Sequence, residues 1–137
     1  MVTKARYMLD TDIVSYLRKQ QIPQLARRFD RLHHGEAVLS VVTYGELLYG
    51  ARLSSDPGKA MQEVQRLSSV LAIMPMPESA AEEYGAIRAE LSKKGSIIGN
   101  NDLWIAAHAL AEDLILVTNN EREFKRVKGL KIENWTK

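Results

Sequence analysis

Five short apolar runs alternate along the chain with longer segments in which apolar residues recur at helical spacing. The runs lie at residues 6–9, 37–41, 72–74, 114–117 and 130–132. Runs of this length between helices are typical of buried strands. Strands joined through helices require right-handed crossovers, which place parallel strands in one sheet with helices on both faces. The sequence therefore predicts an α/β fold with three layers, α/β/α, around a central and mostly parallel sheet.

Proline, glycine and asparagine mark several ends of the expected helices. Pro23 suits a first helical position, and Gly35 breaks the helix that Pro23 opens. Gly95, which follows two lysines, forms a typical C-terminal end. Asparagine is a strong N-cap residue, so a further apolar helix is expected to begin at residue 100 or 101. The remaining helices are expected around residues 13–17, 44–51 and 60–71 and close to residue 124.

Length, charge and composition limit the possible classes of protein. With 137 residues, a single domain over residues 1–137 is the expected organisation. The 19 basic and 17 acidic residues exclude a nucleic-acid binder that relies on net charge alone. The lack of cysteine excludes disulfides, thiolate metal sites and a thiol nucleophile. No apolar run reaches membrane-spanning length, so we expect a cytoplasmic protein with no membrane partner.

Three acids from separate segments are expected to meet at one edge of the sheet. Asp10 directly follows the first strand, and Glu46 follows the second strand by roughly one helical turn. Asp102 lies in the first turn of the apolar helix that leads into the strand at residues 114–117. In such sheets the ligand site lies beyond the carboxyl ends of the strands. Asp102 alone would more simply be a partner of the helix dipole, so the case for a site depends on the other two acids.

Carboxylates gathered in one place repel each other unless a positive charge lies between them. Mg²⁺ is a suitable ion, because it takes oxygen ligands and is usually held by one or two carboxylates together with water. Such an ion activates a water molecule and stabilises charge on a phosphodiester during its cleavage. The sequence offers neither cysteine nor a histidine cluster for a zinc site. The pattern therefore favours Mg²⁺, and we expect Mn²⁺ to substitute for it.

Five motifs carry a resemblance to a known family. They are Met8–Ser15, Tyr44–Ala51, Ile87–Leu91, Asn101–Ala109 and Leu116–Phe124. Each motif is weak alone, but the five in this order and spacing resemble the PIN-domain ribonucleases, specifically the VapC-type toxins of toxin–antitoxin pairs. The resemblance covers essentially the whole chain. It implies a PIN-like fold and an Mg²⁺-dependent endoribonuclease that acts on tRNA, rRNA or mRNA. It also implies a cognate antitoxin as partner, a homodimer and toxin–antitoxin hetero-oligomers.

The resemblance also implies which residues form the catalytic site. Asp10, Glu46 and Asp102 match the metal-binding acids of the family, and Thr118 matches a hydroxyl group beside the site. Glu123 stands where relatives often have aspartate, so its side chain is longer by one methylene group. Glu123 is therefore expected either to reach the metal or to support the metal ligands from outside. All five residues are predicted to take part in catalysis.

Further residues are expected to support these five or to contact RNA. Asp12 stands where many relatives have asparagine, and it could orient Asp10 or a water molecule, or cap the helix that follows. Asn120 is a candidate supporting residue, with simple turn formation as its alternative. Glu123 could instead pair with Arg122 or Lys125 on the surface. The candidate RNA contacts, for which a solvated charge is the ordinary alternative, are Arg88, Arg122 and Lys125.

Two other functions fit part of the pattern. Residues 10–14, Asp-Thr-Asp-Ile-Val, also fit the nucleophile loop of haloacid-dehalogenase-like phosphatases. In that case Asp10 would form an aspartyl-phosphate and Thr118 would bind phosphate, but Glu46 and Asp102 would have no role. The second alternative is a non-catalytic PIN module that binds RNA or an antitoxin, and the full set of acids argues against it.

Overall fold

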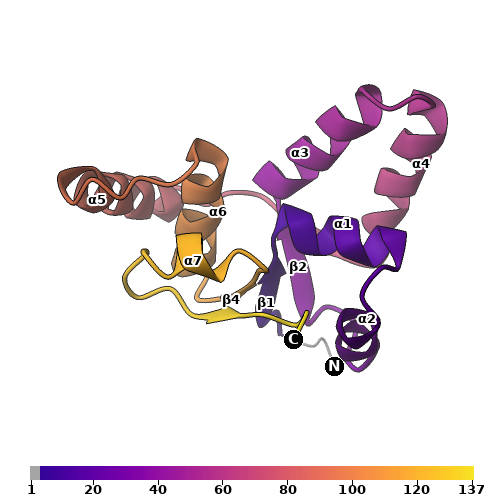
Figure 1. Cartoon of the computed structure of the whole chain (residues 1–137), viewed down its shortest axis with the longest axis horizontal. Helices are drawn as coiled ribbons and strands as arrows, with labels where there is room; N and C mark the ends of the chain where they lie inside the picture. The colour runs from indigo at the N-terminus through magenta and orange to yellow at the C-terminus, as the bar shows by residue number, and fades with distance from the viewer. Residues whose placement is uncertain (1–3) are drawn as a thin grey trace.

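The computed structural model describes residues 4–137, which contain a five-stranded sheet (Figure 1). Each neighbouring pair of strands is parallel, and Tyr7 in the central strand is in register with Ala37 on one side and Ile115 on the other. The prediction of a parallel sheet is therefore confirmed. In spatial order the strands are β3 (Ala72–Met74), β2 (Ala37–Ser40), β1 (Tyr7–Leu9), β4 (Ile115–Val117) and β5 (Ile132–Glu133).

Helices fill the connections between these strands, as the sequence predicted. They are α1 (Thr11–Lys19), α2 (Pro23–Asp30), α3 (Val41–Arg52), α4 (Pro57–Leu67), α5 (Ser79–Lys93), α6 (Asn100–Ala111) and α7 (Glu121–Phe124). In Figure 1, the α3–α4 pair extends away from the sheet on one side, α5 extends on the other, and α6 lies between them. No helix within residues 4–137 combines the length and apolar character that a membrane crossing requires.

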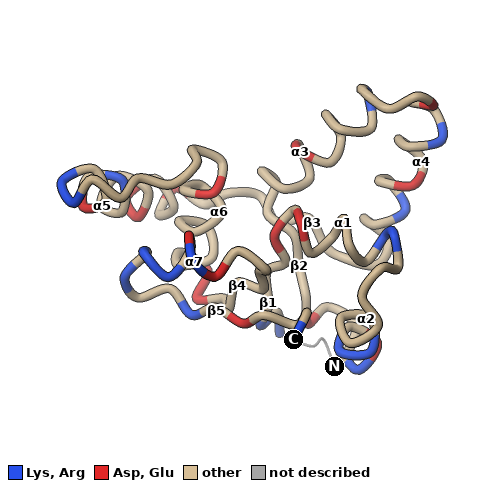
Figure 2. The backbone as a smooth tube through the Cα atoms, viewed as in Figure 1, with Lys and Arg blue, Asp and Glu red and all other residues tan. Residues whose placement is uncertain are grey.

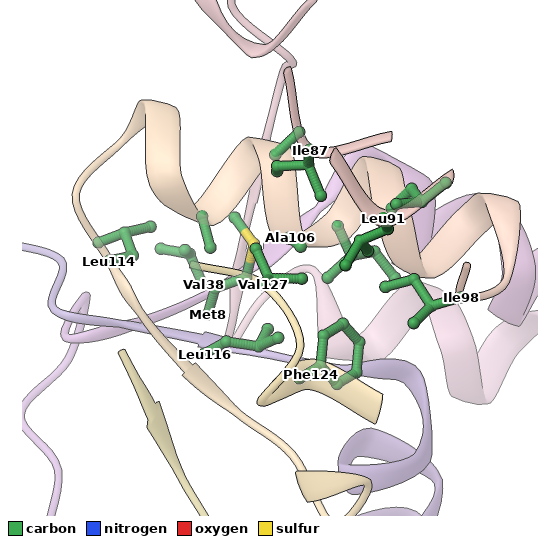
Figure 3. Close-up of a cluster of buried hydrophobic side chains, with 14 residues drawn as sticks. Met8, Val38, Ile87, Leu91, Ile98, Ala106, Leu114, Leu116, Phe124 and Val127 are labelled. Carbon is green, nitrogen blue, oxygen red and sulfur yellow. The ribbon is translucent and has the colours of Figure 1, made fainter. Parts of the chain in front are cut away.

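Two apolar cores, one on each face of the sheet, hold the three layers together. Successive strand residues point to opposite faces, so Met8 packs with α5, α6 and α7 (Figure 3), whereas Tyr7 and Leu9 pack with α1 to α4. On the first face, Phe124 from α7 is 1% exposed and fixes that short helix against the sheet. This arrangement confirms the predicted α/β/α layering. It also brings the starts of α1, α3 and α6 to the carboxyl edge of the sheet.

The second strand passes directly into a helix, one residue earlier than predicted. The strand was expected over residues 37–41, but β2 ends at Ser40 and Val41 is the first residue of α3. Ser40 caps this helix, because its Oγ accepts a hydrogen bond from Val42 N at 3.1 Å. The absence of a loop here places Glu46 less than two helical turns beyond the sheet edge.

Helix α4 lies earlier in the chain than the predicted range of 60–71. Asp56 caps its start by accepting a hydrogen bond from Lys59 N at 3.2 Å, with Pro57 at the first position. Its end at Leu67 is followed by Ser68 and Ser69, whose hydroxyl groups donate to backbone carbonyls three residues earlier. These local bonds compete with continuation of the helix, so the chain leaves α4 before Leu71.

Candidate active site

Asp10 follows β1 and caps α1. Its side chain is buried, with 4% of the residue exposed, and Oδ1 accepts a hydrogen bond from Ile13 N at 2.9 Å. Burial raises the pKa of Asp10 to about 6, and the charges of Asp12 and Glu46 act in the same direction, against the Thr118 hydroxyl and the Ile13 amide. Asp10 is therefore a fixed carboxyl group with other acids close to it.

Asp12 does not cap α1, so this alternative in the sequence analysis is wrong. Asp10 occupies the N-cap position, and Asp12 lies exposed in the first turn. A carboxylate in a first turn complements the helix dipole. Its charge helps to raise the pKa of Asp10, so the influence of Asp12 on the site is electrostatic.

Glu46 is held by two side chains from other helices. Its Oε1 accepts a hydrogen bond from the Thr11 hydroxyl at 2.6 Å, and its Oε2 accepts one from the Asn101 amide at 3.3 Å. Thr11 directly follows Asp10 and Asn101 directly precedes Asp102. The carboxylate of Glu46 thus joins the segments that carry the other two predicted ligands. The sequence analysis assigns no role to Thr11 and only a possible helix cap to Asn101, although each adjoins a candidate acid.

Asp102 lies in the first turn of α6, as predicted, but it does not behave as a simple partner of the helix dipole. Helix N-termini favour the charged carboxylate, yet the pKa of Asp102 is raised to about 7. Burial is the largest cause, followed by a hydrogen bond to the Glu123 carboxyl group and by the charges of Glu123, Glu46 and Asp10. The four acids therefore interact with one another, which is the convergence that the sequence predicted.

Glu123 is directed into the site rather than toward Arg122 or Lys125. Its Oε1 accepts a hydrogen bond from Gly99 N at 3.0 Å, and its Oε2 accepts one from the Asn120 side chain. The Asn120 backbone amide in turn donates to the hydroxyl oxygen of buried Thr118 at 2.9 Å. Asn120 thus links Thr118 to Glu123, so it does more than form a turn.

The start of α6 is where the sequence placed it, but neither asparagine caps it. Gly99 is the N-cap residue and makes no side-chain cap hydrogen bond, while the Asn101 amide is engaged with Glu46. Asn100 Oδ1 accepts a hydrogen bond from the Tyr84 hydroxyl at 2.5 Å. Arg88 donates to that same hydroxyl oxygen at 2.6 Å. Arg88 therefore lies beside the start of α6, outside the group of acids.

Lysine and arginine segments lie at the ends of α2, α4 and α5 and around and after α7, whereas acidic segments from α1, α6 and α7 lie nearer the middle of the molecule (Figure 2). Of the predicted RNA contacts, Arg122 shares a hollow with one of these acids and Lys125 does not. Arg122 lines a hollow of about 340 Å³ together with Glu123, whereas Lys125 does not line it. Arg126 lines it instead.

Comparison with known proteins identifies the family. A family profile described as PIN domain matches residues 7–130. The chain belongs to the PIN-domain family. Its sequence is 45% identical over 130 residues to Ribonuclease VapC2 of Haemophilus influenzae, covering 95% of this chain and 98% of that protein. It is 39% identical over 131 residues to the tRNA(fMet)-specific endonuclease VapC of Shigella flexneri, covering 96% and 98% respectively.

Solved structures of similar proteins support the same family and fold. The structure of VapBC-1 from nontypeable Haemophilus influenzae contains a chain that is 36% identical, with a TM-score of 0.89 and coverage of 98% of this chain and 100% of that chain. The resemblance proposed from the five sequence motifs is therefore confirmed. This PIN domain leaves the phosphatase alternative without support, because Glu46 and Asp102, unused in that alternative, lie within the same group of acids as Asp10.

Proposed function

We propose that this PIN domain is a metal-dependent endoribonuclease and the toxin of a toxin–antitoxin pair. The main support is the group of four carboxyl groups from α3, α6, α7 and the start of α1, whose charges act on one another. The full-length similarity to proteins named Ribonuclease VapC gives independent support for RNA as the substrate. Such a group has no use in a module that only binds RNA, because carboxylates repel phosphate.

Asp10, Glu46 and Asp102 are the proposed metal-holding residues, and Mg²⁺ is the proposed ion. Within residues 4–137, no three histidine, cysteine or acidic side chains form a ready-made metal cluster. That finding does not support the proposal, which rests instead on the chemistry of the donors, because Mg²⁺ prefers oxygen ligands such as carboxylates, water and phosphate. The donors are all carboxylate oxygens, and burial together with the neighbouring acids raises the pKa of Asp10 and of Asp102. When bound, the ion would stabilise negative charge on the phosphodiester and acidify a water molecule.

The other side chains would hold these ligands in place. Thr11 and Asn101 orient the two oxygens of Glu46, and the Ile13 amide orients Asp10. Glu123 lies beside Asp102 and keeps its orientation through Gly99 and Asn120. We propose that Glu123 supports Asp102 from outside the metal-holding acids, because both of its oxygens are already held by Gly99 and Asn120.

An antitoxin is the proposed protein partner. The solved structures of VapBC-1 from nontypeable Haemophilus influenzae and of VapBC2 from Rickettsia felis bound to a DNA fragment from their promoter each contain a chain that is 36% identical to this one. We propose that this chain likewise forms a complex with a cognate antitoxin. A homodimer and toxin–antitoxin hetero-oligomers are part of the same prediction, and sedimentation of the purified chain, alone and with its antitoxin, would measure both.

The decisive experiment is RNA cleavage by the purified chain in Mg²⁺ and in EDTA. The substrates are total tRNA and a single-stranded RNA. We expect cleavage of at least one of them in Mg²⁺ and cleavage of neither in EDTA. Glu46→Gln should lower the rate by about 100-fold or more, because it removes a ligand charge. Glu82→Gln, an exposed substitution on α5, is the matched control and should leave the rate unchanged.

Three results would contradict the proposal. Undiminished cleavage in EDTA after exhaustive dialysis would show that no metal is needed. Binding of RNA without cleavage in Mg²⁺ and in Mn²⁺ would favour the non-catalytic PIN module instead. Normal bacterial growth with intact RNA after expression of the chain without an antitoxin would argue against the toxin role.

A further inference from the structure

Two hollows meet at Gly99. The first, of about 370 Å³, is lined by Glu46, Gly99, Asn100, Asn101 and Asp102. The second, of about 340 Å³, is lined by Ile97, Ile98, Gly99, Asn120, Arg122, Glu123 and Arg126. Gly99 belongs to both linings, so the two hollows adjoin at this residue. A chain-like ligand can therefore occupy both hollows at once.

The second hollow carries the positive charges that the first one lacks. Arg126 is fixed there, because its Nη1 donates to the backbone carbonyls of Ser96 at 3.5 Å and Ile97 at 3.3 Å. Within residues 4–137, neither Arg122 nor Arg126 forms an ion pair with a carboxylate. The nearby Glu123 carboxylate is engaged by Gly99 and Asn120. Both guanidinium groups are therefore available to an anion.

The backbone of Gly99 does not require glycine. Its φ of −56° and ψ of 146° are open to any residue, so what matters here is the missing side chain. A Cβ atom at this position would lie 3.5 Å from Asp102 Oδ2 and 3.8 Å from Glu123 Oε1. A methyl group fits at these distances, but a larger side chain would occupy the junction between the two hollows.

We propose that Arg122 and Arg126 form a phosphate subsite, which binds an RNA backbone phosphate next to the one cleaved at the acids. This inference rests on the proposed ribonuclease activity. RNA carries one phosphate per nucleotide, so a strand whose scissile phosphate lies at Asp102 presents another phosphate beyond Gly99. Guanidinium groups bind phosphate through paired, charge-assisted hydrogen bonds. The two arginines would thus compensate the repulsion between the acids and the strand, and they would fix the register of the RNA.

The first test compares Arg122→Gln and Arg126→Gln with Arg31→Gln, an exposed control at the end of α2. For an RNA that the wild type cleaves, each site variant should raise KM about ten-fold with kcat within about two-fold. The slope of log affinity against log salt should fall by about 0.7 for each phosphate contact removed. Arg31→Gln should behave as the wild type. Unchanged KM and salt slope in both site variants would overturn the subsite.

The second test separates this inference from the proposed activity. Binding of the same labelled RNA is measured by fluorescence anisotropy in Ca²⁺, independently of cleavage in Mg²⁺. Weaker binding by the two arginine variants supports the subsite whatever the cleavage result, and equal binding overturns it. Absence of cleavage by the wild type would contradict only the ribonuclease proposal.

The third test uses Gly99. Gly99→Ala and Gly99→Leu both keep the backbone amide that holds Glu123 and differ only in the size of the added side chain, of which the methyl group makes ordinary contacts. Gly99→Leu should raise KM at least as much as the arginine variants, with the same melting temperature in EDTA as Gly99→Ala. Equal KM values for the two variants would show that RNA does not cross this residue and would overturn the proposed path.

Discussion

The hydroxyl group of Thr11 donates a hydrogen bond to Oε1 of Glu46 at 2.6 Å, across 35 positions of the chain. This bond fixes a carboxylate on α3 to the residue that follows Asp10. Residues that orient a metal ligand typically change metal affinity by about 10- to 100-fold when they are removed. The pair is therefore the most direct place to test how the site is held together.

Replacement of Thr11 by valine should weaken the response to Mg²⁺. Thr11→Val keeps the shape but removes the donor, so we expect the Mg²⁺ concentration for half-maximal cleavage to rise about ten-fold. Thr11→Ser keeps the donor and should stay within about two-fold of the wild type. Equal Mg²⁺ dependence of the two variants would contradict a positioning role for this bond.

Replacement of Asp102 by asparagine should affect activity and metal binding more than folding. At about 6 Å and an effective dielectric of 20, a pair of like charges costs up to roughly 3 kcal/mol before screening. Asp102→Asn removes one charge from the group, so the metal-free variant should be as stable as the wild type or more stable. Added Mg²⁺ should raise its melting temperature less than that of the wild type, and cleavage should be lost.

Melting curves in EDTA and in Mg²⁺ beside a cleavage assay measure all three effects of Asp102→Asn. Asp30→Asn, an exposed substitution at the end of α2, is the control and should change none of them. An Asp102→Asn protein that melts lower in EDTA and cleaves RNA at the wild-type rate would make Asp102 a structural residue only.

The metal-free protein should lose stability as pH rises because of Asp10. Its pKa is about 6 in the folded protein and about 3.9 when unfolded, so the folded state binds more protons between these values. The free energy of unfolding therefore falls as pH rises through this window, by about 3 kcal/mol for Asp10. Asp102, whose pKa is about 7, extends the fall toward neutral pH.

The comparison of wild type with Asp10→Asn in urea titrations at several pH values isolates this effect. Asparagine caps a helix about as well as aspartate, so the variant keeps α1 intact. The comparison is needed because His108 also changes stability with pH. Burial lowers the pKa of His108, so the folded state is destabilised as pH falls below the usual pKa of histidine. Saturating Mg²⁺ should flatten the wild-type curve, since the ion binds the deprotonated acids. Identical pH dependence of the two proteins in EDTA would contradict the prediction.

Ser40 should be important for stability because it has two partners. Its Oγ accepts a hydrogen bond from Val42 N and lies 2.8 Å from Nδ1 of His108, which is fully buried in α6. Ser40→Ala would leave the His108 nitrogen unpaired and remove the cap of α3, at a cost of about 1–3 kcal/mol. Urea unfolding measures this loss, and Ser40→Thr should recover part of it. A loss below about 0.5 kcal/mol would show that His108 finds another partner.

The order of elements and the identity of the acids could be predicted from the sequence. Short apolar runs between helical segments have few solutions other than a parallel sheet, and the carboxyl edge of such a sheet is where helix starts and following acids gather. Spacing alone therefore allows Asp10, Glu46 and Asp102 to meet at one edge, but the family motifs are needed to favour a site role for Glu46 over a solvated position on its helix. The family motifs added Thr118 and Glu123, and the structure brings both to that place.

Only the tertiary structure decided how these acids are held and which neighbours matter. Thr11 and Asn101 bind Glu46 from 35 and 55 positions away, and nothing in their local sequence distinguishes this from helix capping. Short polar side chains have several local partners of similar energy, so the distances set by packing select among them. For the same reason Gly99, and not an asparagine, caps α6, and Arg126 rather than Lys125 lines the hollow beside Glu123. Periodicity determines which elements form, whereas contacts between distant elements decide what each side chain does.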